Sequence, residues 1–270
     1  MPLPFVKLVA AGNAYLALDG RGHERDWGAL ARAMCDDHLG AGSDGLLVAV
    51  RPERAPLGLR IWNSDGSEAE MSGNGVRLFA KFALEGGLAR EGEAGSGLAI
   101  ETRAGVRTVW PVLEGGRMVA GRVALGVPEL QGEETLELGD TKLRVFCLSL
   151  GNPHAVHRTE QPVDAFPLAE LGPRVERHAL FPDRVNFEVV NVLARDRLRV
   201  RVFERGEGET LSSGTGSTAA MVAARLAGAV DASVQVELRG GTLQVAFEGP
   251  GRPAFLEGPT AEVCRGVWPA

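Results

Sequence analysis

Two stretches of the sequence share one pattern: RIWNSDGSEAEMSGNG at residues 60–75 and RVFERGEGETLSSGTG at residues 201–216. The second begins 141 positions after the first, and an arginine, a glutamate and a Ser-Gly-Xaa-Gly loop keep the same spacing in both. In each copy an extended apolar run precedes the loop, and apolar residues at helical spacing follow it. Internal repetition over this distance predicts a duplicated fold.

Weaker matches extend the repeat toward the start of each half. FVKLVAAGN at residues 5–13 is similar to FCLSLGN at residues 146–152. Residues 97–113, 135–150 and 232–249 alternate apolar and polar positions between glycine-containing turns, which is typical of antiparallel strands. We therefore expect an α+β protein of two pseudo-symmetric domains, each a strand-rich sheet around a central helix.

The repeat also places the domain boundaries. We expect an N-terminal half formed by residues 1–118 plus 259–270, with the last strand, near residues 260–268, returning to this first half. Residues 119–258 form the C-terminal half. Because each half contributes one Ser-Gly-Xaa-Gly loop, the active site is expected in the cleft between them.

Composition narrows the class of protein. The chain of 270 residues has a net charge of -6 and no basic run interleaved with aromatic residues, so a nucleic-acid partner is not expected. Its first residues lack the pattern of a signal peptide, and no apolar stretch is long enough to span a membrane. We expect a cytoplasmic protein with no membrane partner. Cys35, Cys147 and Cys264 are far apart, which predicts buried apolar residues rather than a disulfide or metal site.

The two loops carry the chemistry. A Ser-Gly-Xaa-Gly loop that opens a helix points backbone N–H groups and the positive end of the helix dipole at one spot, where an anion is stabilised. Two such loops would hold a carboxylate and place Ser72 and Ser213 on opposite faces of one carbon. This arrangement suits removal of a proton from a stereocentre on one face and its return on the other.

Four blocks in this order resemble those of the diaminopimelate epimerase family: NSDGSEAEMSGNGVR (63–77), GNPHAV (151–156), VNFEVV (185–190) and ERGEGETLSSGTG (204–216). With the first residues and the terminal LEGPTAEV, they cover nearly the whole chain. The resemblance implies an isomerase that epimerises an amino acid without pyridoxal phosphate, metal or other cofactor. It implies the conversion of LL- to meso-diaminopimelate and a role in lysine or cell-wall precursor synthesis.

The resemblance also implies roles for individual residues. Side-chain amides that bind the amino-acid substrate match Asn13, Asn63, Asn152 and Asn186. The backbone amides of Gly73, Asn74, Gly214 and Thr215 match those that hold the α-carboxylate. Glu204 and Arg205 match the pair that binds the distal amino and carboxylate groups, and His154 matches a residue beside the acid/base pair.

One departure from the family matters most. The family carries its two catalytic cysteines at the positions of Ser72 and Ser213. A serine hydroxyl is about five pKa units harder to ionise than a thiol, which corresponds to roughly 7 kcal/mol. Epimerisation through two serines should therefore be impaired. Gly45 is a second departure, because relatives often have a larger residue there.

Three interpretations of these residues stay open. The chain is an epimerase in which serines replaced the cysteines, by nature or by design. Alternatively, it is a divergent isomerase or another racemase of the same fold that uses His154, Glu68 or Glu209 as its acid or base. The third interpretation is a non-catalytic paralogue that binds an amino acid. In each case the partner is a small amino acid, and a homodimer is compatible with the sequence.

Overall fold

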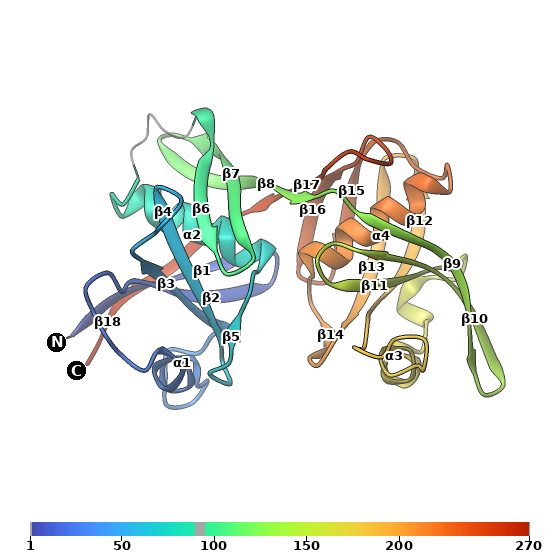
Figure 1. Cartoon of the computed structure of the whole chain (residues 1–270), viewed down its shortest axis with the longest axis horizontal. Helices are drawn as coiled ribbons and strands as arrows, with labels where there is room; N and C mark the ends of the chain where they lie inside the picture. The colour runs from blue at the N-terminus through green and yellow to red at the C-terminus, as the bar shows by residue number, and fades with distance from the viewer. Residues whose placement is uncertain (1, 90–94, 270) are drawn as a thin grey trace. The chain divides into compact units, whose positions relative to one another are not determined.

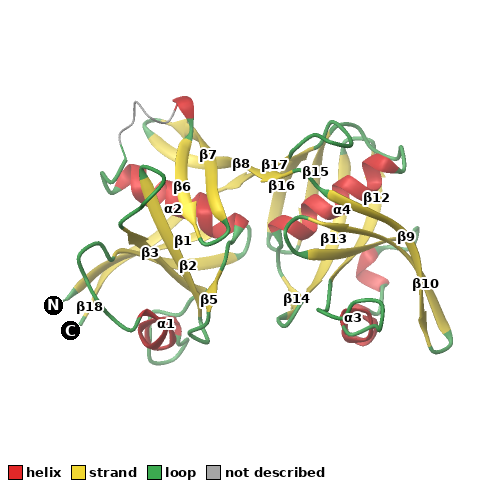
Figure 2. Cartoon of the chain, viewed as in Figure 1, coloured by secondary structure: helices red, strands yellow, loops and turns green. Residues whose placement is uncertain are grey.

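The computed structural model describes residues 2–89 and 95–269, and the chain divides into two compact units (Figure 1). Unit 1 is Met1–Val123 with Glu257–Ala270, and unit 2 is Ala124–Leu256. The α+β class predicted from the sequence is confirmed, because each unit combines strands with helices (Figure 2).

Unit 1 wraps a mixed sheet around the helix α2 (Gly73–Glu85). The strands are paired in the order β18, β1, β2, β3, β4, β6 and β7, and the β2–β3 and β4–β6 pairs are parallel. The strand bounds are β1 Leu3–Ala10, β2 Asn13–Asp19, β3 Gly45–Val50, β4 Leu57–Asn63, β5 Glu68–Ala69, β6 Leu98–Thr102, β7 Gly105–Glu114 and β18 Ala261–Trp268. A second helix, α1 (Trp27–Cys35), connects β2 to β3.

Unit 2 repeats this plan around the helix α4 (Gly214–Leu226). Its strands are paired in the order β9, β10, β11, β12, β13, β15 and β16, and β11–β12 and β13–β15 are parallel. The strand bounds are β9 Glu129–Leu138, β10 Thr141–Ser149, β11 Pro153–Arg158, β12 Asn186–Ala194, β13 Arg197–Glu204, β14 Gly208–Thr210, β15 Ser233–Leu238 and β16 Gly241–Ala246. The 3-10 helix η2 (Val163–Ala165) and the helix α3 (Leu168–Glu176) connect β11 to β12. Strands β8 (Arg117–Gly126) and β17 (Ala254–Pro259) span the two boundaries between the units.

The duplication is visible in both order and length. Helices α2 and α4 are 13 residues long and 141 positions apart, and α1 and α3 are 9 residues long at the same offset. The hairpins predicted from alternating residues are present as β6–β7, β9–β10 and β15–β16. The parallel pairs and the two outer helices α1 and α3 were not predicted, because single strands show no sign of their neighbours' direction.

Burial explains why each central helix lies inside its sheet. Nearly every side chain of α2 from Val76 to Ala83 is buried, and α4 is buried through small residues from Ser217 to Met221. Strand β18 pairs antiparallel with β1. All three cysteines were expected to be buried, and this was wrong for one of them. Cys35 and Cys147 are buried, but Cys264 is exposed, because most side chains of β18 face solvent.

Candidate active site

In unit 1 the candidate site begins where α2 begins. Ser72 is the N-cap of α2, in extended backbone, and its Oγ accepts a 3.0 Å hydrogen bond from the N–H of Gly75. A Cβ at position 75 would lie 3.1 Å from the Ser72 Cβ, so glycine lets the serine sit against the first turn. The first N–H groups of a helix have no partner inside the helix, so those of Gly73 and Asn74 are suited to an anion.

Unit 2 has the same arrangement at the start of α4. Ser213 is the N-cap, and its Oγ accepts a 3.2 Å hydrogen bond from the N–H of Gly216. A Cβ at position 216 would lie 2.9 Å from Oε1 of Glu188 and 3.1 Å from the Ser213 Cβ. Glycine at 216 therefore allows a buried carboxylate to approach the serine loop.

The first asparagines of each half also occupy equivalent places. In unit 1 the Asn74 Nδ2 donates to Asn13 Oδ1, and in unit 2 the Asn152 Nδ2 donates to Thr215 Oγ1 over 3.4 Å. Residues 74 and 215 are 141 positions apart, so each helix start is tied to the strand-leading asparagine of its own unit.

Arg77 anchors the start of α2 from inside unit 1. Its guanidinium is fully buried and donates to the carbonyl of Gly73 over 3.1 Å and to Asn74 Oδ1 over 2.6 Å. Burial lowers the pKa of Arg77 to about 10. The equivalent residue of unit 2, Thr218, donates its hydroxyl to the matching carbonyl of Gly214 over 2.9 Å.

His154 belongs to a buried network in unit 2. Its Nδ1 lies 2.7 Å from Glu188 Oε1, and its Nε2 lies 3.0 Å from Asn152 Oδ1. Burial raises the pKa of Glu188, an effect that its contact with His154 opposes. Sequence reasoning missed Glu188, although it lies in the VNFEVV block. Alternation of apolar and polar residues cannot reveal a buried carboxylate. The signal that could have found Glu188 is its position two residues after Asn186, on the same strand.

Glu204 and Arg205 have separate surroundings. Burial raises the pKa of Glu204, while hydrogen bonds from Thr210 and Ser213 act in the opposite direction. The Arg205 guanidinium is exposed and donates to the carbonyl of Asp183 over 3.2 Å. The Glu204 carboxylate thus lies beside Ser213 of the candidate site. The Arg205 guanidinium is accessible to a ligand from solvent.

Tyr15 also joins the site, although no role for it was predicted from the sequence. It is buried in β2, and its hydroxyl donates to Ser72 Oγ over 3.3 Å. The ring lies over Gly45 on the neighbouring strand, where an added Cβ would be 2.9 Å from Cε1 of Tyr15 and 2.5 Å from the carbonyl oxygen of Trp62. Glycine at position 45 thus makes room for the tyrosine ring.

Two carboxylates considered as alternative acids or bases are held in ion pairs. Glu68 contacts Arg60 and Arg103, each at 3.3 Å. Glu209 binds Arg201 through both oxygens, at 2.8 and 2.9 Å, and these hydrogen bonds lower its pKa. Both therefore brace the β4–β5 and β13–β14 turns rather than stand ready for proton transfer.

Most of the predicted residues form one cluster in each unit. Unit 1 joins Asn13, Ser72, Gly73 and Asn74, and unit 2 joins Asn152, His154, Ser213, Gly214 and Thr215, with Glu204 on Ser213. Asn186 supports the loop, because its Oδ1 accepts from the N–H of Arg205 over 3.0 Å. Two predicted residues lie outside these clusters. Asn63 Nδ2 donates to Ser67 Oγ within its own turn over 3.0 Å, and the Arg205 guanidinium donates to the carbonyl of Asp183. Within residues 2–89 and 95–269, no three His, Cys, Asp or Glu side chains are placed to hold a metal ion.

Known proteins resemble the chain along nearly its whole length. The family model described as "Diaminopimelate epimerase" matches residues 5–129 and 146–262. A diaminopimelate epimerase of Moorella thermoacetica is 41% identical over 280 residues, which cover 98% of this chain and 99% of that protein. One of Halorhodospira halophila is 41% identical, covering 97% of this chain and 93% of that protein. The chain belongs to the diaminopimelate epimerase family.

Solved structures support the same fold at low sequence identity. A hydroxyproline epimerase from Agrobacterium vitis has a TM-score of 0.76 and is 16% identical, covering 99% of this chain and 92% of that chain. A phenazine biosynthesis protein of the PhzF family from Bacillus anthracis has a TM-score of 0.77 at 17% identity, with both chains fully covered. Membership in the diaminopimelate epimerase family makes the protein an isomerase, as the sequence predicted.

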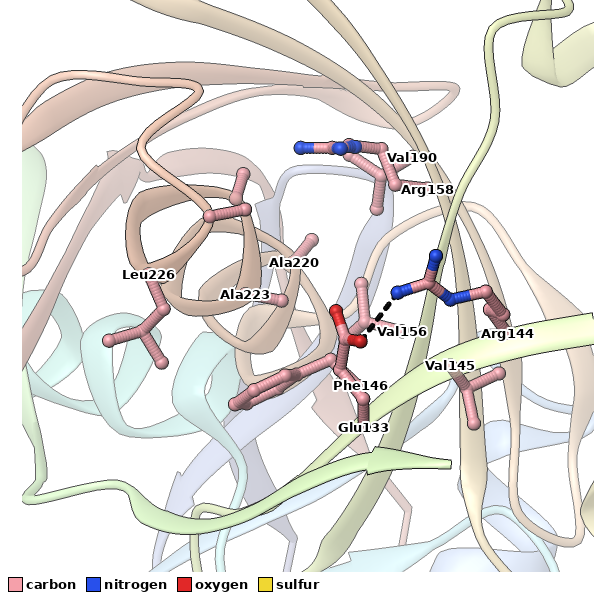
Figure 3. A pocket seen from close by; sticks show the side chains of 12 residues that line it. Glu133, Arg144, Val145, Phe146, Val156, Arg158, Val190, Ala220, Ala223 and Leu226 are labelled. Atoms are coloured by element: carbon pink, nitrogen blue, oxygen red, sulfur yellow. Dashed lines mark hydrogen bonds and ion pairs between the residues drawn. The ribbon is translucent and has the colours of Figure 1, made fainter. Parts of the chain in front are cut away.

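Unit 2 also contains a hollow, whose lining side chains are drawn in Figure 3. It has a volume of about 260 Å³ and lies along α4 beside Ala220 and Ala223. The equivalent residues of α2 are Phe79 and Phe82, whose rings contact each other. Alanines where unit 1 has phenylalanines thus account for the hollow. None of the residues that line it belongs to the predicted site.

No helix in the part of the chain that the structure describes is long and apolar enough to cross a membrane. A small amino acid fits an epimerase as its substrate.

Proposed function

We propose that the protein binds diaminopimelate without a cofactor and epimerises its α-carbon between the LL and meso forms, at a rate impaired by serine at both acid/base positions. The observation that carries this proposal is the pair of N-capping serines, Ser72 and Ser213, which hold the same place at two equivalent helix starts. On this proposal the two helix starts act on one substrate molecule, with residues 1–118 plus 259–270 forming one half and residues 119–258 the other.

Several features support the substrate class. The free N–H groups at two helix starts suit a carboxylate. The exposed Arg205 guanidinium can bind the distal carboxylate. The two curated relatives named above are both diaminopimelate epimerases. We further infer a cytoplasmic, homodimeric enzyme of lysine biosynthesis, consistent with the acidic composition.

The serines limit the rate rather than the binding. Each hydroxyl occupies the position of a thiol, so the shape of the site is kept. Ionising a hydroxyl in place of a thiol costs roughly 7 kcal/mol more, because the pKa difference is about five units. A racemase with another substrate and a non-catalytic binding protein remain the alternatives, and both predict a different ligand or no exchange.

Calorimetry with meso- and LL-diaminopimelate tests the proposal. We expect binding without added metal or pyridoxal phosphate, and Arg205→Ala should weaken it by at least tenfold, the loss of one charge-assisted contact of about 1.5–3 kcal/mol. Arg252→Ala, a change at an exposed arginine between β16 and β17, is the matched control and should leave affinity unchanged. Binding that is insensitive to Arg205→Ala would show that the distal role is wrong, and no binding would contradict the proposed substrate.

A further inference from the structure

The duplication gives Tyr15 a partner in unit 2. Tyr15 follows Asn13 by two positions on β2, and His154 follows Asn152 by two positions at the start of β11. Each of these strands pairs with a parallel neighbour, β2 with β3 and β11 with β12. The register places Tyr15 opposite Gly45 and His154 opposite Asn186. Residues 45 and 186 are 141 positions apart, so the two strand pairs coincide. Tyr15 therefore occupies in unit 1 the place that His154 occupies in unit 2.

The hydrogen bonds of Ser72 determine where its own proton can point. A serine oxygen has two acceptor lone pairs and one proton. Ser72 Oγ accepts from the N–H of Gly75 over 3.0 Å and from the Tyr15 hydroxyl over 3.3 Å. Both lone pairs are engaged, so the Ser72 proton is left to point at a substrate. Ser213 differs, because its hydroxyl is bonded to the Glu204 carboxylate.

We propose that Tyr15 is the proton reservoir of the unit 1 half, acting through Ser72. This inference rests on the proposed function. As the new α-carbon–hydrogen bond forms, the Ser72 O–H bond breaks, and the Tyr15 proton moves to Ser72 Oγ and leaves a tyrosinate. On the opposite face the α-carbon–hydrogen bond breaks, its electron pair stays on the α-carbon, and the proton passes through Ser213 to the Glu204 carboxylate. Water returns both groups to their starting protonation, or the reverse reaction does so.

Magnitudes favour the phenol over the serine alone. A phenol has a pKa near 10 and a thiol one near 8.5, so the tyrosine is about 1.5 units harder to ionise, against about five for serine. Relaying the charge to Tyr15 recovers about 3.5 of these units, or roughly 10³-fold in rate. Tyr15 is a positioning residue in this scheme, because Ser72 alone touches the substrate.

The steric contact with Gly45 links two residues of unit 1. A side chain at position 45 would enter the space of the tyrosine ring, since its Cβ would lie 2.9 Å from Cε1 of Tyr15. The small residue at 45 and the tyrosine at 15 are thus two parts of one feature.

The kinetic test is Tyr15→Phe, measured by deuterium incorporation at the α-carbon of diaminopimelate across pH. We expect kcat to fall about 10³-fold with KM nearly unchanged, and the alkaline limb of the profile to disappear. In the Ser72→Cys background the same change should cost less than about tenfold, because a thiol needs no phenol. Thr102→Val is the control, since Thr102 donates a buried hydroxyl to Gly105 elsewhere in unit 1 and its loss should leave both rates unchanged. An equal loss in the serine and cysteine backgrounds would overturn the inference.

A second readout needs no turnover. Tyr15 is the only tyrosine of the chain, so growth on 3-fluorotyrosine labels this residue alone. The fluorine resonance should titrate with pH, and Ser72→Ala should move both its shift and its midpoint, whereas Thr102→Val should not. The more acidic fluorophenol should also move the alkaline limb of the rate profile to lower pH. A fluorine titration indifferent to Ser72→Ala overturns the inference, whereas absence of diaminopimelate binding with an intact fluorine response counts against the proposed function alone.

Discussion

The starts of α2 and α4 have the same backbone but different neighbours. At α2 the N-cap Ser72 accepts from Tyr15, and the first turn is held by the buried cation of Arg77. At α4 the N-cap Ser213 meets Glu204, and Thr218 replaces the arginine. Tyr15 therefore presents a proton donor to the serine of unit 1, whereas Glu204 presents a carboxylate to the serine of unit 2. The duplicated fold thus keeps Ser72 and Ser213 at equivalent positions but places a hydrogen-bond donor beside the first and a carboxylate beside the second.

The largest effect on rate is expected when both N-capping serines are replaced by the more acidic cysteine. In the Tyr15→Phe background, where no phenol relays the charge, Ser72→Cys with Ser213→Cys should raise α-proton exchange and epimerisation of diaminopimelate by up to about 10⁵-fold, the factor for roughly 7 kcal/mol. With Tyr15 in place the same pair of changes should give only about 10²-fold, because the relay already recovers about 10³-fold. Each single change should give much less, because an acid and a base that act together behave non-additively. Deuterium incorporation in both directions is the measurement.

The control for that experiment lies one residue away. Ser212 is buried, and its Oγ has no hydrogen-bond partner within residues 2–89 and 95–269. Ser212→Cys adds a thiol beside α4 without placing it at the N-cap, so the rate should not change. An unaltered protein that already exchanges as fast as the double cysteine variant would contradict the account of the serines.

The next largest effect is a loss of unfolding free energy that is confined to unit 2. Glu188→Ala removes the carboxylate from the buried pair with His154 and should cost about 3 kcal/mol of unfolding free energy. Glu237→Ala is the control, because its ion pair with Arg197 at 3.8 Å is partly exposed and should cost less than about 1 kcal/mol. All four tryptophans belong to unit 1. In urea unfolding we expect the circular dichroism transition to shift more than the tryptophan transition, and the reverse order would count against a defect confined to unit 2.

A smaller loss of unfolding free energy is expected in unit 1, beside Tyr15. Gly45→Ala places a Cβ 2.5 Å from the Trp62 carbonyl oxygen and against the Tyr15 ring, so overpacking should cost about 1–3 kcal/mol. Tryptophan fluorescence during urea unfolding measures this in unit 1. Gly95→Ala meets open space and is the control. If both variants unfold at the same urea concentration as the parent, position 45 does not confine the tyrosine.

The smallest effect concerns the cysteines that the protein does contain. Burial raises the pKa of Cys147 to about 11 and also raises that of Cys35. The thiolate is the reactive form, so at pH 8 a thiol reagent should modify the exposed Cys264 first and the two buried cysteines slowly. The rate at Cys147 should rise as the pH approaches 11. Mass spectrometry of the modified peptides gives the order, and a fast Cys147 would contradict its burial.

Local pattern was enough to predict the helix starts. The repeat at 141 residues revealed both loops, because a Ser-Gly-Xaa-Gly sequence before an apolar helix has its own signature. It did not reveal Tyr15 or Glu188, because their roles depend on contacts with residues 57 and 34 positions away. The pairing of Tyr15 with Gly45 required the parallel register of β2 and β3, which no single strand encodes. Cys264 was misjudged because edge exposure is likewise a property of the sheet.

The central claim is that both helix starts hold one diaminopimelate molecule. Titration of the ¹⁵N-labelled protein with meso-diaminopimelate, followed at the backbone amides of Gly73, Asn74, Gly214 and Thr215, tests it most directly. The account predicts that all four resonances move together, with one dissociation constant and one ligand per chain. Movement confined to one pair of amides, or two pairs with different dissociation constants, would contradict it.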